Sequence, residues 1–279
     1  MISPSISLTL AFLRARPDAA AKILEQHTSS DVSEFFRKIP SESASLVISR
    51  MLPYSAARAI EPLENESATS ILSHLDPTKT ANLLRHLSSS SREAILAKLP
   101  AKIRKPCKTL LAHDEKQVGA WMRPNPIALS IDVTVEEAIN TLRTQLPTAE
   151  MERVFVIDRD GFLKGSIPLS TLISAQSEQT VATLVNAKPR SVTAQAYITS
   201  LDSSPIWNGR DLLPVVDQQK RLVGTLRHSD FRNARSQLTG QKLDHSEPHL
   251  APTLFDVYLN TLWTLVTSVI GEYAPKSKN

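Results

Sequence analysis

The stretch that decides the fold is VFVIDRDGFLKGSI, at residues 154–167, and it recurs as LPVVDQQKRLVGTL at residues 213–226. Each copy begins with an apolar run rich in β-branched residues, turns at an aspartate (Asp158 or Asp217), and continues into a second apolar run that contains a glycine. This pattern predicts a β-hairpin in each copy, with the glycine where two backbones approach closely. Because the same unit occurs twice, we expect two equivalent clefts, one in each copy.

The residues around each hairpin repeat as well. A helical stretch follows each hairpin, and a short strand with an amphipathic stretch precedes it, at residues 127–129 and 134–146 in the first copy and 191–193 and 196–203 in the second. Thr134 and Glu137 form a capping box, which predicts that a helix begins there. The order strand, helix, strand, strand, helix, written twice, resembles a tandem pair of CBS domains. This resemblance implies an α+β region, with one domain over residues 118–176 and the other over 177–238.

The amino-terminal part of the chain has a different pattern. Glycine is absent between residues 10 and 105, apolar residues recur with helical spacing, and prolines interrupt them. The interruptions come about every dozen residues or twice that, as at Pro40, Pro53, Pro77 and Pro100. This rhythm predicts one short helix per interval and an α-solenoid over residues 1–117. Proline ends one helix, and the Ser, Thr or Asp beside it caps the next.

Leucine- and proline-rich repeats that lead through residues 118–122 into a CBS pair are similar to the cytosolic half of the MgtE family of magnesium channels. The resemblance covers residues 10–235. It implies an N domain of short superhelical repeats, a homodimer held through the CBS pair, and regulation by Mg²⁺ or an adenine nucleotide. Family members continue into a membrane pore, whereas this sequence stops at Asn279, so we expect it to conduct no ions alone.

Acidic residues bear on the magnesium prediction. In the MgtE family, Mg²⁺ neutralises facing carboxylates of an acidic N domain, but here Lys and Arg slightly outnumber Asp and Glu in the amino-terminal domain. The acidic groups that stand out are Glu61, Glu64 and Glu66, and the pair Asp114 and Glu115. Solvated helix faces and caps explain these acids more simply than a metal site does. Asp114 and Glu115 are therefore only weak candidates for metal binding.

The resemblance also implies nucleotide pockets. CBS domains that bind adenine nucleotides place a Ser or Thr, for phosphate, and then an Asp, for the ribose hydroxyls, after the glycine-containing strand. The candidate nucleotide-binding residues of the second copy are Asp230, Arg227, Thr225 and Val192. Asp230 matches the ribose position, whereas Arg227 replaces the hydroxyl residue and could meet phosphate. Two simpler explanations stay open: Asp230 caps a helix that ends near Ala234, or it pairs with Arg227. In the first copy Pro168 and Thr171 occupy the two positions.

Composition and charge argue against several classes of protein. A net charge of +4 over 279 residues is mild and the basic residues are dispersed, so we expect no nucleic-acid partner. The single cysteine, Cys107, excludes an internal disulfide and fits a reducing compartment. The first apolar run lacks the charge order of a secretory leader, and no apolar stretch reaches the roughly 18 to 20 residues of a spanning helix. We therefore expect a cytoplasmic protein that meets the inner face of a membrane at most peripherally. Motifs of catalysis are missing, so we expect no enzyme.

The carboxyl-terminal residues 253–271 have the spacing of an amphipathic helix, after a polar linker at residues 239–252. The residues predicted to dock on a partner or a membrane are Phe255, Tyr258, Leu259, Leu262, Trp263 and Val266. Packing back on the CBS pair, entering a partner's groove and lying on lipid remain alternatives. In the linker, Pro248 lies between His245 and His249, which favours a polar linker over a metal site.

These features predict a non-enzymatic regulatory or adaptor protein that couples ligand binding or assembly to a membrane protein or a larger complex. The alternative is a structural scaffold subunit whose CBS ligand sites have degenerated.

Overall fold

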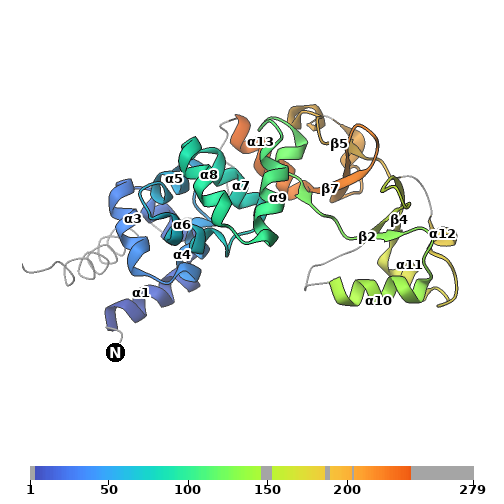
Figure 1. The fold of residues 1–279 in the computed structure, drawn as a ribbon, viewed down its shortest axis with the longest axis horizontal. Coiled ribbons are helices and arrows are strands. Elements are labelled where there is room, and N and C mark those ends of the chain that lie inside the picture. Colours follow the sequence, from blue (N-terminus) through green and yellow to red (C-terminus); the bar gives the residue numbers. More distant parts are fainter. Residues whose placement is uncertain (1–3, 146–152, 186–188, 203, 240–279) are drawn as a thin grey trace, which may run out of the picture. The chain divides into compact units, whose positions relative to one another are not determined.

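The structure is a computed structural model that describes residues 4–145, 153–185, 189–202 and 204–239. The chain divides into two compact units, one containing Met1–Cys107 and the other Lys108–Leu243. The first unit is built from helices alone among its described residues, and the second combines short helices with two small sheets (Figure 1).

The helices of the first unit begin at a regular interval. The bounds are α1 (Pro4–Ala15), α2 (Pro17–Leu24), α3 (Ser29–Lys38), α4 (Ser41–Ile48), α5 (Pro53–Ile60), α6 (Asn65–Leu72), α7 (Pro77–Arg85), α8 (Ser89–Lys98) and α9 (Ala101–Leu111), which crosses into the second unit. From α2 to α9 the first residues are 17, 29, 41, 53, 65, 77, 89 and 101, a constant step of 12. The predicted rhythm of one short helix per dozen residues is confirmed.

From α2 to α8, each helix packs against the next but one along the chain, as α3 does with α5 and α4 with α6. The hydroxyl of Ser33 on α3 donates a hydrogen bond of 2.7 Å to the carbonyl of Ala59 on α5. Apolar residues of successive helices, such as Val47, Ile60 and Leu72, are buried between them. This stacking confirms the predicted α-solenoid, because each helix is too short to bury an apolar face without its neighbours.

Three of the helix starts have a capping residue of the predicted kind. The side chains of Thr28, Asp76 and Ser88 accept hydrogen bonds from backbone N–H groups in the first turns of α3, α7 and α8. Prolines begin α2, α5 and α7, where a missing N–H costs nothing because the first turn has no partner for it. Proline in this chain therefore marks the beginning of the next helix as much as the end of the last.

The two sheets of the second unit are copies of one design. The first copy contains β2 (Ala128–Ser130), α10 (Val135–Gln145), β3 (Arg153–Ile157), β4 (Leu163–Pro168) and α11 (Leu169–Ser174). The second contains β5 (Val192–Thr193), β6 (Leu212–Val216), β7 (Leu222–Arg227) and α13 (His228–Thr239). In both, the first strand is parallel to the second and the last two form an antiparallel hairpin. Even the register shift of the hairpin falls at the same place, Val156/Ile157 and Val215/Val216.

The segment before each copy forms hydrogen bonds with the other copy. In the short helix η1 (Val118–Ala120), the Val118 N–H donates to the Ala196 carbonyl of the second copy at 2.8 Å. At the start of α12 (Val181–Leu184), the Val181 N–H donates to the Val133 carbonyl of the first copy at 2.9 Å. The strand β1 (Arg123–Pro124) precedes the first copy but pairs with β7, so the second sheet has the order β1-β7-β6-β5. Each copy is therefore incomplete without the other.

The prediction of a helix at residues 196–203 is wrong. Residues 196–203 were expected to form a helix like α10, but the structure has the 3₁₀ turn η2 (Ile198–Leu201), followed by a second one, η3 (Pro205–Trp207). The hydroxyl of Ser200 donates to the Tyr197 carbonyl at 2.7 Å, and Pro205 disfavours helical backbone just before it. By contrast, the capping box of α10 is present, with the Thr134 and Glu137 side chains each accepting from the other's N–H.

Candidate ligand site in the second copy

Asp230 lies in the first turn of α13, where a carboxylate is favoured by the helix dipole. Its two oxygens accept hydrogen bonds from Arg123, at 2.8 Å from Nε to Oδ2 and 3.3 Å from Nη2 to Oδ1. The Asp230 side chain is only 18% exposed and that of Arg123 is 47% exposed. The helix runs to Thr239, so the expectation that Asp230 caps a helix ending near Ala234 is wrong.

The strand pairing brings Arg123 to this place. Arg123 on β1 is directly opposite Thr225 on β7, and Pro124 is opposite Gly224. A Cβ atom on Gly224 would lie 2.6 Å from Met122 Sδ and 3.0 Å from the Arg123 carbonyl oxygen. Glycine therefore fits where β1 pairs with β7, and the close approach of backbones predicted from the sequence is present there.

The predicted nucleotide residues do not all lie together. Thr225 is buried, and Arg227 follows it two residues later at the end of the same strand. Residues directly opposite in an antiparallel pair share a face of the sheet, as do residues two apart, so Arg123, Thr225 and Arg227 are on one face. Val192 is on β5, at the other edge of the sheet, where it is buried opposite Val215. The structure brings together Asp230, Thr225 and Arg227, adds Arg123, and leaves Val192 apart.

The corresponding place in the first copy has no carboxylate. Thr171 on α11 matches Asp230, and Pro168, at the start of the same helix, matches Arg227. The hydroxyl of Ser166, which matches Thr225, accepts a hydrogen bond of 3.2 Å from Arg153 Nη2. The two copies share a backbone but differ in chemistry.

Some of the acidic residues considered for metal binding have partners within the protein. Asp114 Oδ1 accepts from the Lys116 N–H at 2.8 Å, and at Glu115 the backbone carbonyl accepts from the Trp121 indole at 2.6 Å. The Glu61 carboxylate accepts from the hydroxyls of Ser88 and Ser91 at 2.6 and 2.9 Å. Within the described ranges, no three His, Cys, Asp or Glu side chains gather in a group that could hold a metal ion.

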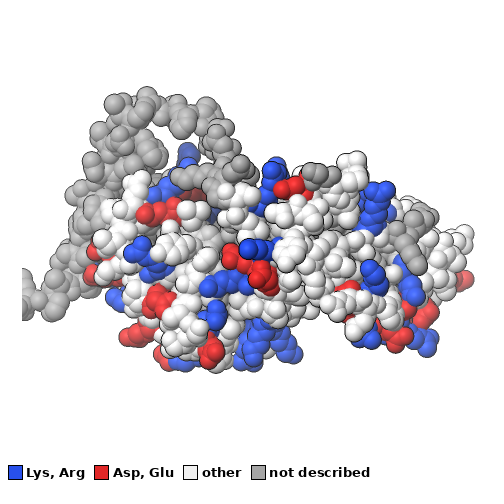
Figure 2. Space-filling model, turned by 90° about the horizontal axis from the view of Figure 1, so that it is seen from above, with Lys and Arg blue, Asp and Glu red and all other residues white. Residues whose placement is uncertain are grey.

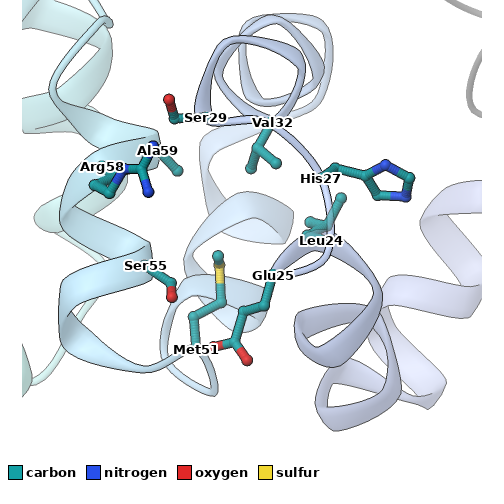
Figure 3. A pocket seen from close by; sticks show the side chains of 9 residues that line it. All are labelled: Leu24, Glu25, His27, Ser29, Val32, Met51, Ser55, Arg58 and Ala59. Carbon is teal, nitrogen blue, oxygen red and sulfur yellow. The ribbon is translucent and has the colours of Figure 1, made fainter.

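A pocket in the first unit lies between α2, α3 and α5 (Figure 3). Its lining residues are Leu24, Glu25, His27, Ser29, Val32, Met51, Ser55, Arg58 and Ala59. Glu25 Oε1 accepts from the Leu52 N–H at 2.6 Å and so caps α5, while the His27 ring points away from Arg58. Burial lowers the pKa of His27, against the smaller opposing effect of the nearby Asp31 carboxylate. None of the residues singled out from the sequence lines this pocket.

The sequence predicts that basic residues are dispersed over the surface. In the view of Figure 2, Lys and Arg side chains are interspersed with Asp and Glu. The described helices include none that is both long and apolar enough to span a bilayer. The linker histidines His245 and His249 and the docking residues from Phe255 to Val266 lie outside the described residues.

Comparison with known families supports the division into an all-helical and a mixed part. Residues 15–116 match the model of the MgtE intracellular N domain, and residues 117–178 match the model of the CBS domain. The chain therefore contains an MgtE N domain followed by a CBS domain, and it resembles the cytosolic region of MgtE.

One curated relative is the magnesium transporter MgtE of Thermus thermophilus, which is 33% identical over 136 residues. The aligned residues make up 47% of this chain and 30% of that transporter. The chain thus matches less than a third of the transporter's length.

Two solved structures share the fold. The crystal structure of the cytosolic domain of the Mg²⁺ channel MgtE in complex with ATP is 24% identical, with a TM-score of 0.57, and the match covers 82% of this chain and 99% of that one. The crystal structure of the soluble part of a magnesium transporter is 18% identical, with a TM-score of 0.59, and the match covers 85% of this chain and 99% of that one.

Proposed function

We propose that this chain, in which an MgtE intracellular N domain precedes a CBS domain, is a non-enzymatic regulatory or adaptor protein that couples ligand binding or assembly to a membrane partner. The observation that carries the proposal is this order of domains together with the exchange of leading segments between the two copies. Because β1 precedes the first copy and pairs with the second, a ligand-induced change in the second copy reaches the segment that leads into the tandem.

The regulatory ligand is an adenine nucleotide held at Asp230, with Mg²⁺ as a second candidate. Asp230, Thr225 and Arg227 gather at one edge of the second sheet, and a solved structure of the same fold is a complex with ATP. Vicinal ribose hydroxyls can donate to a carboxylate, and a guanidinium suits phosphate. The described carboxylates of the first unit offer Mg²⁺ no ready-made cluster, so magnesium is the weaker of the two.

The protein responds to its ligand because the ligand binds one arrangement of the protein more tightly than another. A ligand shifts the balance between two arrangements of the protein only by as much as it prefers one of them. We propose a homodimer associated through the CBS tandem, in the cytoplasm at the inner face of a membrane. Residues 253–271, including Tyr258 and Trp263, would meet the membrane partner.

A second candidate function is a structural scaffold subunit with degenerate ligand sites. The observation that favours it is the first copy, where Pro168 and Thr171 replace the polar pair. The ion pair between Asp230 and Arg123 also supplies the remaining carboxylate with a partner inside the protein.

Thermal-shift titration of the full chain with ATP, AMP and MgCl₂ separates the two functions. A ligand that binds only the folded state at a hundred times its Kd adds about 2.7 kcal/mol of stability, so a sensor should show a saturable rise in melting temperature. A scaffold should show no rise and should instead purify with one stoichiometric partner. No rise and no partner would contradict both.

A further inference from the structure

We propose that Arg123 is the phosphate-recognising residue of the Asp230 site, and that the Arg123–Asp230 ion pair is a latch that a ribonucleotide opens. The inference rests on the proposed function, because it names the ligand class and the control of that same site. Arg123 comes from the segment that precedes the first copy, yet it acts in the second.

The latch is a well-formed contact between distant parts of the chain. Two hydrogen bonds join Arg123 and Asp230, which are 107 positions apart in the sequence. Two-point contact between a guanidinium and a carboxylate is among the stronger polar interactions in proteins. With Asp230 mostly buried, its carboxylate depends on Arg123 for its partner.

Breaking such a pair is costly when either charge is left without a partner. A ligand therefore opens the latch at low cost only if it supplies both replacements. A ribonucleotide does so, because its phosphate can take the Arg123 guanidinium and its two ribose hydroxyls can donate to Asp230. Adenosine replaces only one partner, and inorganic phosphate only the other.

The neighbouring side chains suit an anion. Arg227 and the buried hydroxyl of Thr225 lie on the same face of the sheet as Arg123. A phosphate that draws Arg123 away from Asp230 would thus lie near a second guanidinium and a hydroxyl donor. Both groups come from β7, which leads directly into α13 and Asp230.

The Arg123–Asp230 ion pair belongs to the second copy, and its counterpart in the first copy differs. In the first copy Thr171 stands where the second has Asp230, and Arg153 is hydrogen-bonded to Ser166. A threonine cannot form an ion pair, so the exchange of partners described above is available only in the second copy. We therefore expect one ribonucleotide per chain.

Opening the latch would release α13 from β1. The strand β1 belongs to the segment that leads into the tandem, and α13 is the last described helix before the carboxyl-terminal residues. Ligand binding would thereby change the connection between the beginning and the end of the tandem, which is the connection that a relay needs.

Isothermal titration of the full chain with adenosine, AMP and inorganic phosphate tests the latch. The wild-type protein should bind AMP at least about tenfold more tightly than adenosine, since only AMP satisfies both charges. In Arg123→Gln, AMP should lose about tenfold in affinity and adenosine should gain, because Asp230 no longer has a partner to give up. The ratio of the two Kd values should then fall close to one.

Two further variants keep the test interpretable. Arg159→Gln is the matched control, since it removes an arginine from an exposed ion pair of 2.8 Å with Asp132 in the first copy, and it should leave both affinities unchanged. Arg123→Lys keeps the positive charge without the two-point contact and should give an intermediate ratio, which covers the case that Arg123→Gln does not fold. If the ratio of the adenosine Kd to the AMP Kd is the same in wild type as in Arg123→Gln or Arg123→Lys, the latch is wrong, although the protein still binds the nucleotide. Failure of wild type to bind AMP removes nucleotide sensing itself, and the latch with it.

Discussion

Gly161 and Lys220 occupy the same position in the two hairpin turns, and both have positive φ, 84° and 69°. A Cβ on Gly161 would meet nothing within 4 Å, so a substitution there tests backbone strain without a clash. We expect Gly161→Ala to lower the free energy of unfolding by about 1 kcal/mol in a urea titration. Lys220→Gly, which relieves the same strain, should be neutral or stabilise by up to about 1 kcal/mol. A neutral Gly161→Ala would contradict this explanation of the turn.

Asp158 begins the first of these turns. A hydrogen bond from Lys164 lowers the pKa of its carboxyl below the ordinary value. Desolvation opposes this shift, and the N–H groups of Phe162 and Asp160 add to it. Because the pKa is lower in the folded protein, the carboxylate stabilises the turn fully above the unfolded pKa, and this stabilisation is lost as the pH falls through the folded one. An NMR titration from pH 6 to about 2 should show the Phe162 amide moving at a pH below the ordinary carboxyl pKa. Asp158→Asn should abolish that movement, and a midpoint at or above the ordinary value would refute the assignment.

Helix α10 depends on its capping box, because Thr134 and Glu137 together satisfy two N–H groups that the first turn leaves without partners. Thr134→Ala should therefore lower the free energy of unfolding by about 1 kcal/mol. Thr144→Ala is the matched control, since Thr144 is exposed in the last turn of the same helix and its hydroxyl bonds only a neighbouring carbonyl. Urea unfolding of both variants decides the matter: equal stability of the two would show that the box does not hold the helix.

The elements themselves were largely predictable because their signals are local. Apolar runs rich in β-branched residues and the turn aspartates predicted both hairpins, and the rhythm of about a dozen residues predicted the short helices. The segment at residues 196–203 misled the prediction, since its apolar spacing is helical but it has no capping box like that of Thr134 and Glu137. Hydroxyl side chains that bond to the nearby backbone, together with Pro205, favour the observed 3₁₀ turns over an α-helix.

The functional site was less predictable, because its decisive contact is not local. Asp230 and Arg227 could be singled out by their places after a glycine-containing strand, but no pattern in the sequence connects Asp230 to Arg123. That contact exists only because β1 leaves the first copy and pairs with β7 of the second. An exchange of strands between two similar units changes no residue pattern, so nothing in the sequence shows that β1 pairs with β7.

The exchange also defines the whole molecule, since a tandem in which each copy is completed by the other can carry a signal from its first strand to its last helix. Hydrogen exchange of the full chain, with and without saturating ATP, tests this most directly. We expect ATP to change exchange both in residues 118–124 and in β7 and α13, and to leave the α10 region of the first copy unaffected. Exchange that is the same with and without ATP throughout the tandem would contradict it.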